Sequence, residues 1–497
     1  MKGRLPSALA LALALLAILG TAYISTVVFE RVPHLEDEFA NLWQARVIAR
    51  GELTLPSPSE PRSFLVPFVI DYQGQRFGKY PPGWPAALSL GARAGAAWLV
   101  NPLLAGLAVW LTFRLGSKLL GAWAGLLAAL LLASSPMFLM LSASLMSHTF
   151  SLVLCLIFTL AWFELFFPGP EGGHVPRRGL LTALAGSSLG LLALTRPWTA
   201  VAIAVPFIVD AGLRMLRGGR DERLQLLAIA GLAGLLSACI LLWQYALTGD
   251  ALLNPYTLWW PYDRLGFGPG IGVTEKGHNL YWAFYNSRFS LRAGMHDLFG
   301  WPYLSWLFLP FGIFALRRER KAWLLAGIVL ALIAFYAAYW IGSWLFGPRY
   351  YAEALPALAV LSAAGIAWAG VWCNPPGLAA RARRLAVTAL VAMLLAANVL
   401  WYLPARIGGL HGLYHITRAP SAWIEQQDLG HALLMVQADH WYGYAQLLPL
   451  VEPFTESDLL VAWSRGPQVD GELIASLPDR AVYTYDAPRG VLRAGAP

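Results

Sequence analysis

An acidic cluster beside a long apolar segment is the first group of residues in this 497-residue chain that could do chemistry. It consists of Glu36, Asp37 and Glu38, shortly after His34. An amphipathic helix with its apolar face in the membrane interface is predicted over 38–50, because Phe39, Leu42, Trp43 and Val47 recur at helical spacing. Asp37 falls at the N-cap of this helix. Backbone N–H groups and the helix dipole keep a carboxylate ionised there. Residue type alone favours a capping role, because aspartate is among the commonest caps.

Three basic residues at the ends of apolar segments could bind a phosphate: Lys79, Arg196 and Arg349. Both arginines lie in very short turns that the predicted membrane topology places on the outer side. Arginine is uncommon in short outer loops, so a functional role could explain its presence there. A guanidinium offers paired donors to phosphate and stays charged near a membrane. A local ion pair is the alternative, for instance between Arg349 and Glu353. For Lys79, snorkelling to the interface is the common role.

The amino-acid composition indicates that these residues belong to a membrane protein, whose helices must position them. The chain is 58% hydrophobic and 13% charged, against about 25% charged in soluble proteins. Its apolar runs are each long enough to cross roughly 30 Å of hydrocarbon. About eleven transmembrane helices are predicted, at 5–29, 97–114, 119–139, 148–167, 179–195, 197–213, 224–247, 298–316, 322–341, 352–372 and 385–403. The segment 84–95 is short and follows prolines, which predicts a re-entrant or interfacial helix.

The distribution of basic residues predicts the orientation. With a cytoplasmic N-terminus, every inside segment is basic, as the positive-inside rule requires. The net charge of +8 is therefore a topology signal, and no nucleic-acid partner is predicted. The outside pieces are loop 30–96, loop 248–297 and a C-terminal segment, 404–497. We predict a multi-pass protein of the inner or plasma membrane with a transmembrane domain, 1–403, and a small extracytoplasmic α/β cap, 404–497.

Several motifs occur together along residues 1–403. In chain order they are His34-x-x-Asp37-Glu38, Gln44-Ala45, Gly51, Lys79-Tyr80-Pro81-Pro82-Gly83-Trp84-Pro85, Asn101-Pro102, Ser147-His148 and Gly347-Pro348-Arg349-Tyr350. This set resembles the GT-C membrane glycosyltransferases. More narrowly, it is similar to the bacterial relatives of the protein O-mannosyltransferases (family 39-like) and to the lipid A aminoarabinose transferase. The resemblance implies an all-α polytopic membrane domain.

The resemblance also implies an activity. A sugar would pass from a polyprenyl-phosphate donor to a hydroxyl of a glycan, lipid or protein acceptor on the outer face, with inversion. In that class an aspartate of the first outer loop activates the acceptor, which maps onto Asp37 with Glu38 beside it as catalytic residues. The departing phosphate would be bound by Arg349, with Lys79 and Arg196.

Five further residues are candidates for substrate binding: His34, Tyr80, His148, His278 and Tyr350. Many relatives carry an acidic residue near His148, so this histidine is a departure. It could bind the acceptor, ligate a divalent metal with Glu38, or form an ordinary interfacial hydrogen bond. No other cofactor is predicted. For the aromatic residues of loop 248–297, an interfacial belt is the default interpretation.

A multi-pass lipid or solute transporter, or flippase, is the alternative function. Membrane-edge arginines and aromatics would serve passage as well as catalysis. Transporters usually place polar residues near the midplane, whereas the predicted spans here are poor in charge. The ionisable residues gather on one face instead, which favours an enzyme.

Overall fold

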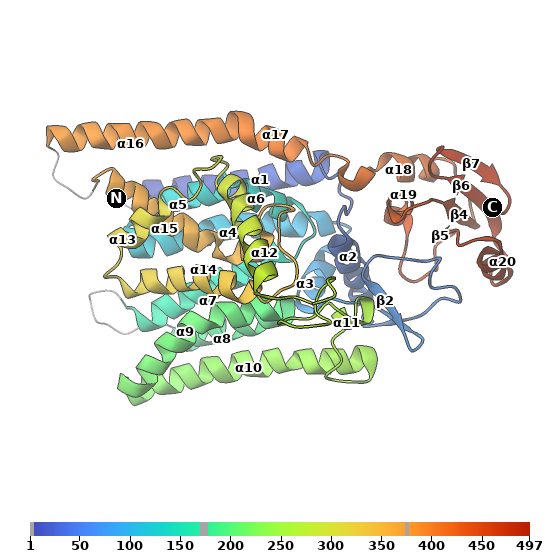
Figure 1. Cartoon of the computed structure of the whole chain (residues 1–497), viewed down its shortest axis with the longest axis horizontal. Helices are drawn as coiled ribbons and strands as arrows, with labels where there is room; N and C mark the ends of the chain where they lie inside the picture. Colours follow the sequence, from blue (N-terminus) through green and yellow to red (C-terminus); the bar gives the residue numbers. More distant parts are fainter. Residues whose placement is uncertain (1–3, 169–176, 373–376) are drawn as a thin grey trace.

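A bundle of long apolar helices forms most of the protein in a computed structural model, which describes residues 4–168, 177–372 and 377–497 (Figure 1). Among these residues, eight helices are long and apolar enough to cross a membrane. A ninth crossing results if α5 (Ala122–Ala133) and α6 (Pro136–Ala143), bent by 60°, are one span. The eight are α1 (Arg4–Val27), α4 (Ala97–Leu120), α7 (His148–Phe166), α8 (Arg178–Thr195), α9 (Pro197–Arg217), α10 (Arg220–Thr248), η1 with α15 (Arg349–Ala369), and the segment Leu378–His415 that begins with α16 (Leu378–Ala397).

The predicted count of eleven spans is not confirmed. The segment 298–316 contains only the short helix α13 (Leu309–Ala315). Gly300 lies in the left-handed region, with φ of 66°, and Pro302 lacks a backbone N–H, so no helix continues through this part of the apolar run. The helix predicted at 322–341 is α14 (Arg320–Tyr336), which has 17 residues.

The two ends of the bundle differ in character. Figure 1 shows the N-terminus, the turn between α9 and α10 and the start of α16 at one end, and the C-terminal sheet beyond the other. The first end carries basic residues of the predicted inside segments, including Arg214, Arg217, Arg220, Arg223, Arg381, Arg383 and Arg384. The elements of the first outer loop lie at the opposite end.

That opposite end is built from α2 (Glu36–Ala49), a small antiparallel sheet and α3 (Gly83–Arg93). The sheet has the order β1-β3-β2, with β1 (Leu55–Pro56), β2 (Val69–Tyr72) and β3 (Gln75–Gly78). The helix predicted at 38–50 is α2, starting two residues earlier. With 11 residues, α3 is too short to cross a bilayer, in agreement with the prediction. A Cβ at Gly83 would overlap the backbone of Leu194, so glycine permits α3 to approach the end of α8.

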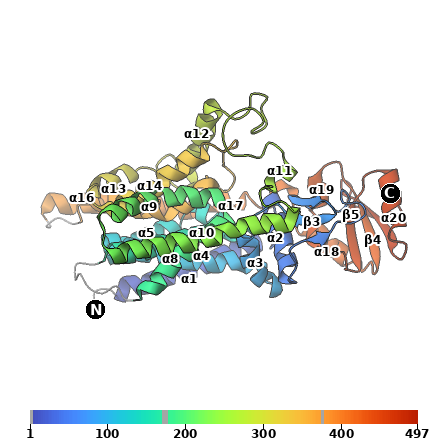
Figure 2. The same cartoon turned by 90° about the horizontal axis from the view of Figure 1, so that it is seen from below.

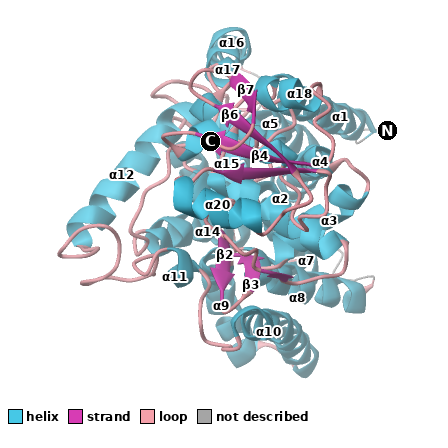
Figure 3. Cartoon of the chain, turned by 90° about the vertical axis from the view of Figure 1, so that its right-hand side faces the viewer, coloured by secondary structure: helices cyan, strands magenta, loops and turns pink. Residues whose placement is uncertain are grey.

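The C-terminal part forms a four-stranded sheet of order β5-β4-β6-β7 (Figure 3). Its strands are β4 (Ala432–Gln437), β5 (Leu459–Trp463), β6 (Ala481–Asp486) and β7 (Val491–Ala494), of which β5, β4 and β6 run parallel and β7 is antiparallel to β6. Helices α18 (Ala419–Glu425), α19 (Trp441–Ala445) and α20 (Pro467–Ala475) accompany it. These strands and helices lie within the segment 404–497, for which a small α/β cap is predicted, and the domain boundary at 403 stays a prediction.

The C-terminal sheet shares a hydrophobic core with α2. Phe39, Trp43 and Val47 are buried in the same cluster as Leu434 and Tyr444. The sequence predicted that this apolar face of α2 lies in the membrane interface, and the structure corrects that prediction because protein covers the face. Polar contacts reinforce the packing: Arg46 Nη1 donates to the Val451 carbonyl at 3.1 Å and Arg50 Nη1 pairs with Glu456 at 2.6 Å.

Candidate active site

A cavity of about 750 Å³ lies where α2, the small sheet and the helix ends meet. Seven of the residues singled out from the sequence line it: Asp37, Lys79, Tyr80, His148, Arg196, Arg349 and Tyr350. They come from the first outer loop, two turns between long helices and the start of α7. Folding therefore collects acidic, basic and aromatic side chains from distant parts of the chain in one place.

The first turn of α2 presents Asp37 to this cavity. The N-cap is Leu35, so the prediction that Asp37 is the N-cap is wrong. Glu38 satisfies the free N–H groups instead, because its position allows its side chain to reach back over the helix start. Its Oε2 accepts from the backbone N–H groups of His34 at 3.1 Å and Leu35 at 3.0 Å. Asp37 is left free to face the cavity.

Asp37 is held as a carboxylate by its neighbours. Tyr80 donates its hydroxyl to Oδ1 at 2.6 Å, and Arg349 Nη2 lies 3.7 Å from Oδ2. Burial raises the pKa of Asp37, but Arg349, the Tyr80 hydrogen bond and Lys79 together outweigh burial, and the pKa lies below its usual value. The ionised group can accept a proton from a hydroxyl aligned with it.

Glu38 occupies a different environment from Asp37. It is 3% exposed and is not among the cavity-lining residues. Its Oε1 accepts from the Leu145 N–H at 2.7 Å, which ties α2 to the turn before α7. Burial raises the pKa of Glu38, and the three backbone N–H groups oppose this rise. The geometry favours a structural role, and a catalytic role for Glu38 stays a prediction.

The Glu38 and His148 side chains do not fit a metal site. Both Glu38 oxygens accept backbone N–H groups, and His148 Nε2 lies 2.6 Å from the Arg196 guanidinium. A cation at that nitrogen would face an existing positive charge. In the described part of the chain, no three His, Cys, Asp or Glu side chains are grouped to hold a metal ion.

Arg349 keeps donor capacity for a ligand. Its Nη1 is buried without a hydrogen-bond partner among the described residues, while Nη2 faces Asp37. The local pair with Glu353, considered as an alternative role, is not formed: Glu353 pairs with Arg196, with Nε and Oε1 3.2 Å apart. A guanidinium with a free N–H in a cavity is suited to an anionic group.

Arg196, in contrast, is committed to protein partners. Besides Glu353 and His148, it donates from Nη2 to the Tyr336 hydroxyl at 2.9 Å and from Nε to Thr199 Oγ1 at 3.2 Å. These partners belong to α7, α9, α14 and η1. Arg196 thus joins four helices beside the cavity, and its predicted role in phosphate binding would require some of these contacts to break.

Replacement of Arg196 by alanine is expected to destabilise the protein by about 3–5 kcal/mol, because it leaves the charge of Glu353 buried and unpaired. Glu353 is 1% exposed. Thermal unfolding in detergent measures the loss, and the double variant Arg196→Ala/Glu353→Gln should recover part of it. An unchanged unfolding temperature in Arg196→Ala would show that the pair does not support the fold.

Lys79 lies in an aromatic cage with one acidic partner. Its Nζ is 3.4 Å from the Phe68 ring centre and 5.0 Å from those of Tyr256 and Trp260. Its ion pair is to Asp263, with Nζ and Oδ2 3.5 Å apart. Burial lowers the pKa of Lys79, and Asp263 opposes that change. The ammonium is held inside the cavity, so the snorkelling alternative does not describe it.

Sequence reasoning missed several residues of this cavity. Asp263 accepts from Tyr339 at 2.9 Å and from the Trp340 indole at 3.0 Å, and it anchors Lys79. Glu36 and Tyr256 also line the cavity. The signal for Asp263 was its position among the aromatics of loop 248–297, which were interpreted as an interfacial belt.

Two predicted substrate-binding residues lie elsewhere. His34 is buried, with Nδ1 3.0 Å from the Val32 carbonyl oxygen, and it does not line the cavity. His278 has Nε2 2.8 Å from the Ala337 carbonyl oxygen and lines a second pocket. The structure therefore does not bring either histidine to Asp37.

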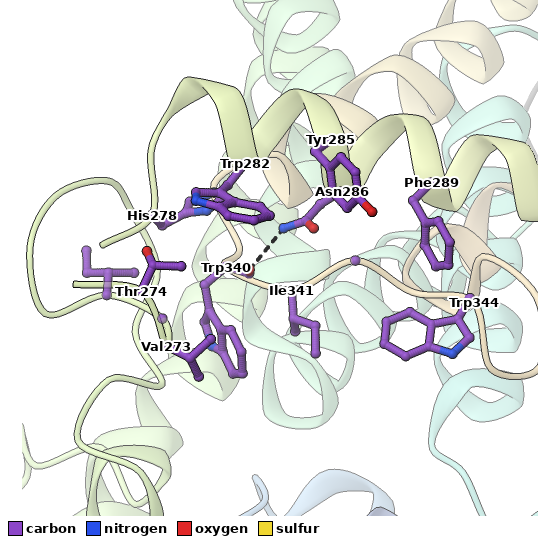
Figure 4. A pocket seen from close by; sticks show the side chains of 13 residues that line it. Val273, Thr274, His278, Trp282, Tyr285, Asn286, Phe289, Trp340, Ile341 and Trp344 are labelled. Carbon is purple, nitrogen blue, oxygen red and sulfur yellow. Dashed lines mark hydrogen bonds between the residues drawn. The ribbon is translucent and has the colours of Figure 1, made fainter. Parts of the chain in front are cut away.

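The second pocket, of about 340 Å³, lies between α12 (Leu280–Asp297) and the segment 340–344 (Figure 4). Its lining includes the aromatic side chains of Trp282, Tyr285, Phe289, Trp340 and Trp344, and the labelled amide of Asn286 donates to the Trp340 carbonyl at 2.9 Å. Figure 2 shows α12 projecting sideways from the bundle. Trp340 and Ile341 line both this pocket and the main cavity, so the two spaces share a wall.

Comparison with known proteins defines the class of fold. No protein-family model matches the chain, and no curated protein matches its sequence. Its structure is similar to that of ArnT from Cupriavidus metallidurans bound to undecaprenyl phosphate, with 16% identity over 96% of this chain and 89% of that one and a TM-score of 0.57. It is also similar to the oligosaccharyltransferase AglB from Archaeoglobus fulgidus in complex with an inhibitory peptide and a dolichol-phosphate, with 12% identity, 98% and 74% coverage and a TM-score of 0.53.

ArnT and AglB are both GT-C glycosyltransferases. The chain therefore has the fold of that class along nearly its whole length, as its motifs predicted.

Proposed function

We propose that the protein is a membrane glycosyltransferase that transfers a sugar from a polyprenyl-phosphate donor to an acceptor hydroxyl. One observation carries the proposal: Asp37 and Arg349, whose Nη1 has no partner among the described residues, line the same cavity. The first supplies a base and the second a site for an anionic leaving group. The GT-C fold supports this assignment, and ArnT and AglB were solved with polyprenyl-type phosphates.

The donor phosphate lies against Arg349 in this proposal, with Lys79 as a second cation. Positive charge on the departing phosphate lowers the barrier to breaking its bond to the sugar. Lys79 reaches the phosphate only when its contact with Asp263, 3.5 Å away, loosens. The isoprenoid chain lies along the pocket beside α12 in this proposal, and Trp340 and Ile341, which line both spaces, have to move aside to connect that pocket with the cavity.

The acceptor hydroxyl attacks the anomeric carbon while Asp37 takes its proton. A bond forms from the hydroxyl oxygen to that carbon, and the bond from the carbon to the phosphate oxygen breaks. A single displacement from the opposite face inverts the anomeric centre. The acceptor is a hydroxyl of a glycan, lipid or protein. Tyr80 keeps the carboxylate oriented through its 2.6 Å hydrogen bond.

The cavity faces the outside of the cell membrane in this proposal, and the N-terminus lies in the cytoplasm. Support comes from the basic residues at the opposite end of the bundle, because short basic segments remain inside. The C-terminal sheet is then extracytoplasmic. Nucleotide sugars are absent on that side of the membrane, so a lipid-linked donor would supply the sugar there.

Mass spectrometry of the glycans, lipids and proteins of the cell envelope tests the function. Cells with the wild-type protein are expected to carry a sugar addition that cells with Asp37→Asn lack. Spectra of wild-type cells identical to those of cells lacking the gene would contradict a glycosyltransferase, whereas a sugar addition retained in Asp37→Asn cells would contradict only the role of Asp37 as the base. A flippase would move a lipid between leaflets without forming a glycosidic bond.

A further inference from the structure

One ring nitrogen of His148, the first residue of α7, has a partner and the other has none. Arg196 Nη1 lies 2.6 Å from His148 Nε2. A guanidinium can only donate, so Nε2 must accept, and His148 is a neutral imidazole with its hydrogen on Nδ1. Among the described residues, this Nδ1 is buried without a hydrogen-bond partner, and His148 is 3% exposed. A buried N–H without an acceptor costs free energy, which a ligand oxygen would recover.

The contacts of Arg196 fix this tautomer of His148. Arg196 is held by Glu353 at 3.2 Å, by the Tyr336 hydroxyl at 2.9 Å and by Thr199 Oγ1 at 3.2 Å. Its guanidinium stays protonated, so it keeps the Nε2 lone pair of His148 occupied. His148 therefore offers the cavity a hydrogen-bond donor and no free lone pair.

The start of α7 adds further donors at the same place. Met146, Ser147 and His148 all line the main cavity. The N-cap of this 19-residue helix is Ser147, whose side chain makes no capping hydrogen bond. The backbone N–H groups of residues 148–150 have no hydrogen-bond partner in the described part of the chain. A helix that begins with free N–H groups has a positive end, which favours an anion.

Arg349 supplies a second unpartnered side-chain donor to this cavity. It begins η1 (Arg349–Ala354), which packs against α7. Its Nη1 is buried without a partner among the described residues, and both Arg349 and His148 line the cavity. Because His148 is neutral, it adds a donor beside two arginines without adding charge repulsion. Free donors on two packed elements suit one anion with several acceptor oxygens, such as a phosphate.

We propose that the donor phosphate binds between Arg349 and the start of α7, with His148 donating from Nδ1 to a phosphate oxygen. The inference rests on the proposed glycosyltransferase function and adds a binding residue to it. The hydrogen bond strengthens as the bond from the sugar to the phosphate breaks, because the departing phosphate gains negative charge. Arg196 is then a positioning residue that acts through His148, and none of its contacts has to break.

Two substitutions of His148 separate the roles of its two nitrogens. In His148→Asn the side-chain amide lies where Nδ1 was and can donate, but the acceptor for Arg196 is lost. In His148→Gln the amide reaches the former position of Nε2, and its oxygen can accept from Arg196, but no donor replaces Nδ1. We expect His148→Gln to weaken binding of undecaprenyl phosphate about tenfold, whereas His148→Asn should retain most of the affinity.

Equilibrium binding of undecaprenyl phosphate to the full-length protein in nanodiscs measures these affinities, and thermal unfolding checks that both variants are folded. Undecaprenol, which lacks the phosphate, should bind the wild type and both variants alike. His440→Gln is the matched control, because His440 is exposed and does not line the cavity. This control should bind undecaprenyl phosphate as the wild type does.

Wild-type affinity in His148→Gln, or equal losses in His148→Gln and His148→Asn, would overturn the role of Nδ1. In that case the wild type would still prefer undecaprenyl phosphate to undecaprenol, and wild-type cells would still carry an envelope sugar that cells lacking the gene do not. A wild type without that preference would contradict both the phosphate subsite and the proposed donor.

Discussion

Replacement of Asp37 by asparagine is expected to slow sugar transfer by a factor of about 10²–10⁴, the usual contribution of a positioned general base. Asparagine keeps the shape of the side chain, and its carbonyl oxygen can still accept the Tyr80 hydroxyl, now 2.6 Å from Oδ1. It cannot take the acceptor proton. Initial rates with purified protein in proteoliposomes measure the loss, and binding of undecaprenyl phosphate should persist because Arg349 is retained.

Glu52→Gln is the control for this variant. Glu52 is an exposed acidic residue of the same outer loop and does not line the cavity, so its replacement should leave the rate unchanged. Transfer at the normal rate by Asp37→Asn would show that another group removes the proton.

Replacement of Arg349 by alanine is expected to weaken binding of undecaprenyl phosphate about 10–100-fold, since a hydrogen bond to a charged group is worth about 1.5–3 kcal/mol. It should also change the pH dependence. Arg349 lowers the pKa of Asp37, and activity requires the ionised carboxylate, which is present above that pKa. Loss of Arg349 raises the pKa, so the acid limb of the rate profile shifts to higher pH.

Affinity measurements and pH–rate profiles check both effects of Arg349. Arg349→Lys should fall between the wild type and alanine, because an ammonium keeps the charge but not the paired donors. Arg93→Ala serves as a control, since Arg93 is exposed at the same end of the protein and, among the residues that the structure describes, its side chain donates only to the Ala49 carbonyl. Unchanged affinity together with an unshifted acid limb would refute both roles.

Much of the fold could be predicted because apolar length and turn residues are local signals. The long helices, α2 and the C-terminal strands all follow from them. The segment 298–316 was misjudged because its composition is apolar, although Gly300 and Pro302 interrupt the helix. The packing of α2 against the C-terminal sheet was also missed, since an apolar helix face looks the same whether lipid or protein covers it.

Individual residues of the candidate site could be predicted from the sequence, but the pairs that their side chains form could not. Asp37 and Arg349 were recognisable from residue type and resemblance, whereas their pairing depends on how distant helices pack. The same limit explains why Glu353, which the sequence offers as an alternative partner of Arg349 four residues away, instead pairs with Arg196. The only sequence signal for Asp263 was its position among the aromatics of loop 248–297, and its contact with Lys79 depends on the tertiary packing.

The position of a bound lipid phosphate tests the central proposal most directly. A cryo-electron microscopy map of the full-length protein in nanodiscs with undecaprenyl phosphate would locate it. We expect the phosphate inside the cavity within hydrogen-bond distance of Arg349 Nη1, on the side of the cavity that also holds Asp37. A phosphate bound outside this cavity, with no contact to Arg349, would contradict the proposed site.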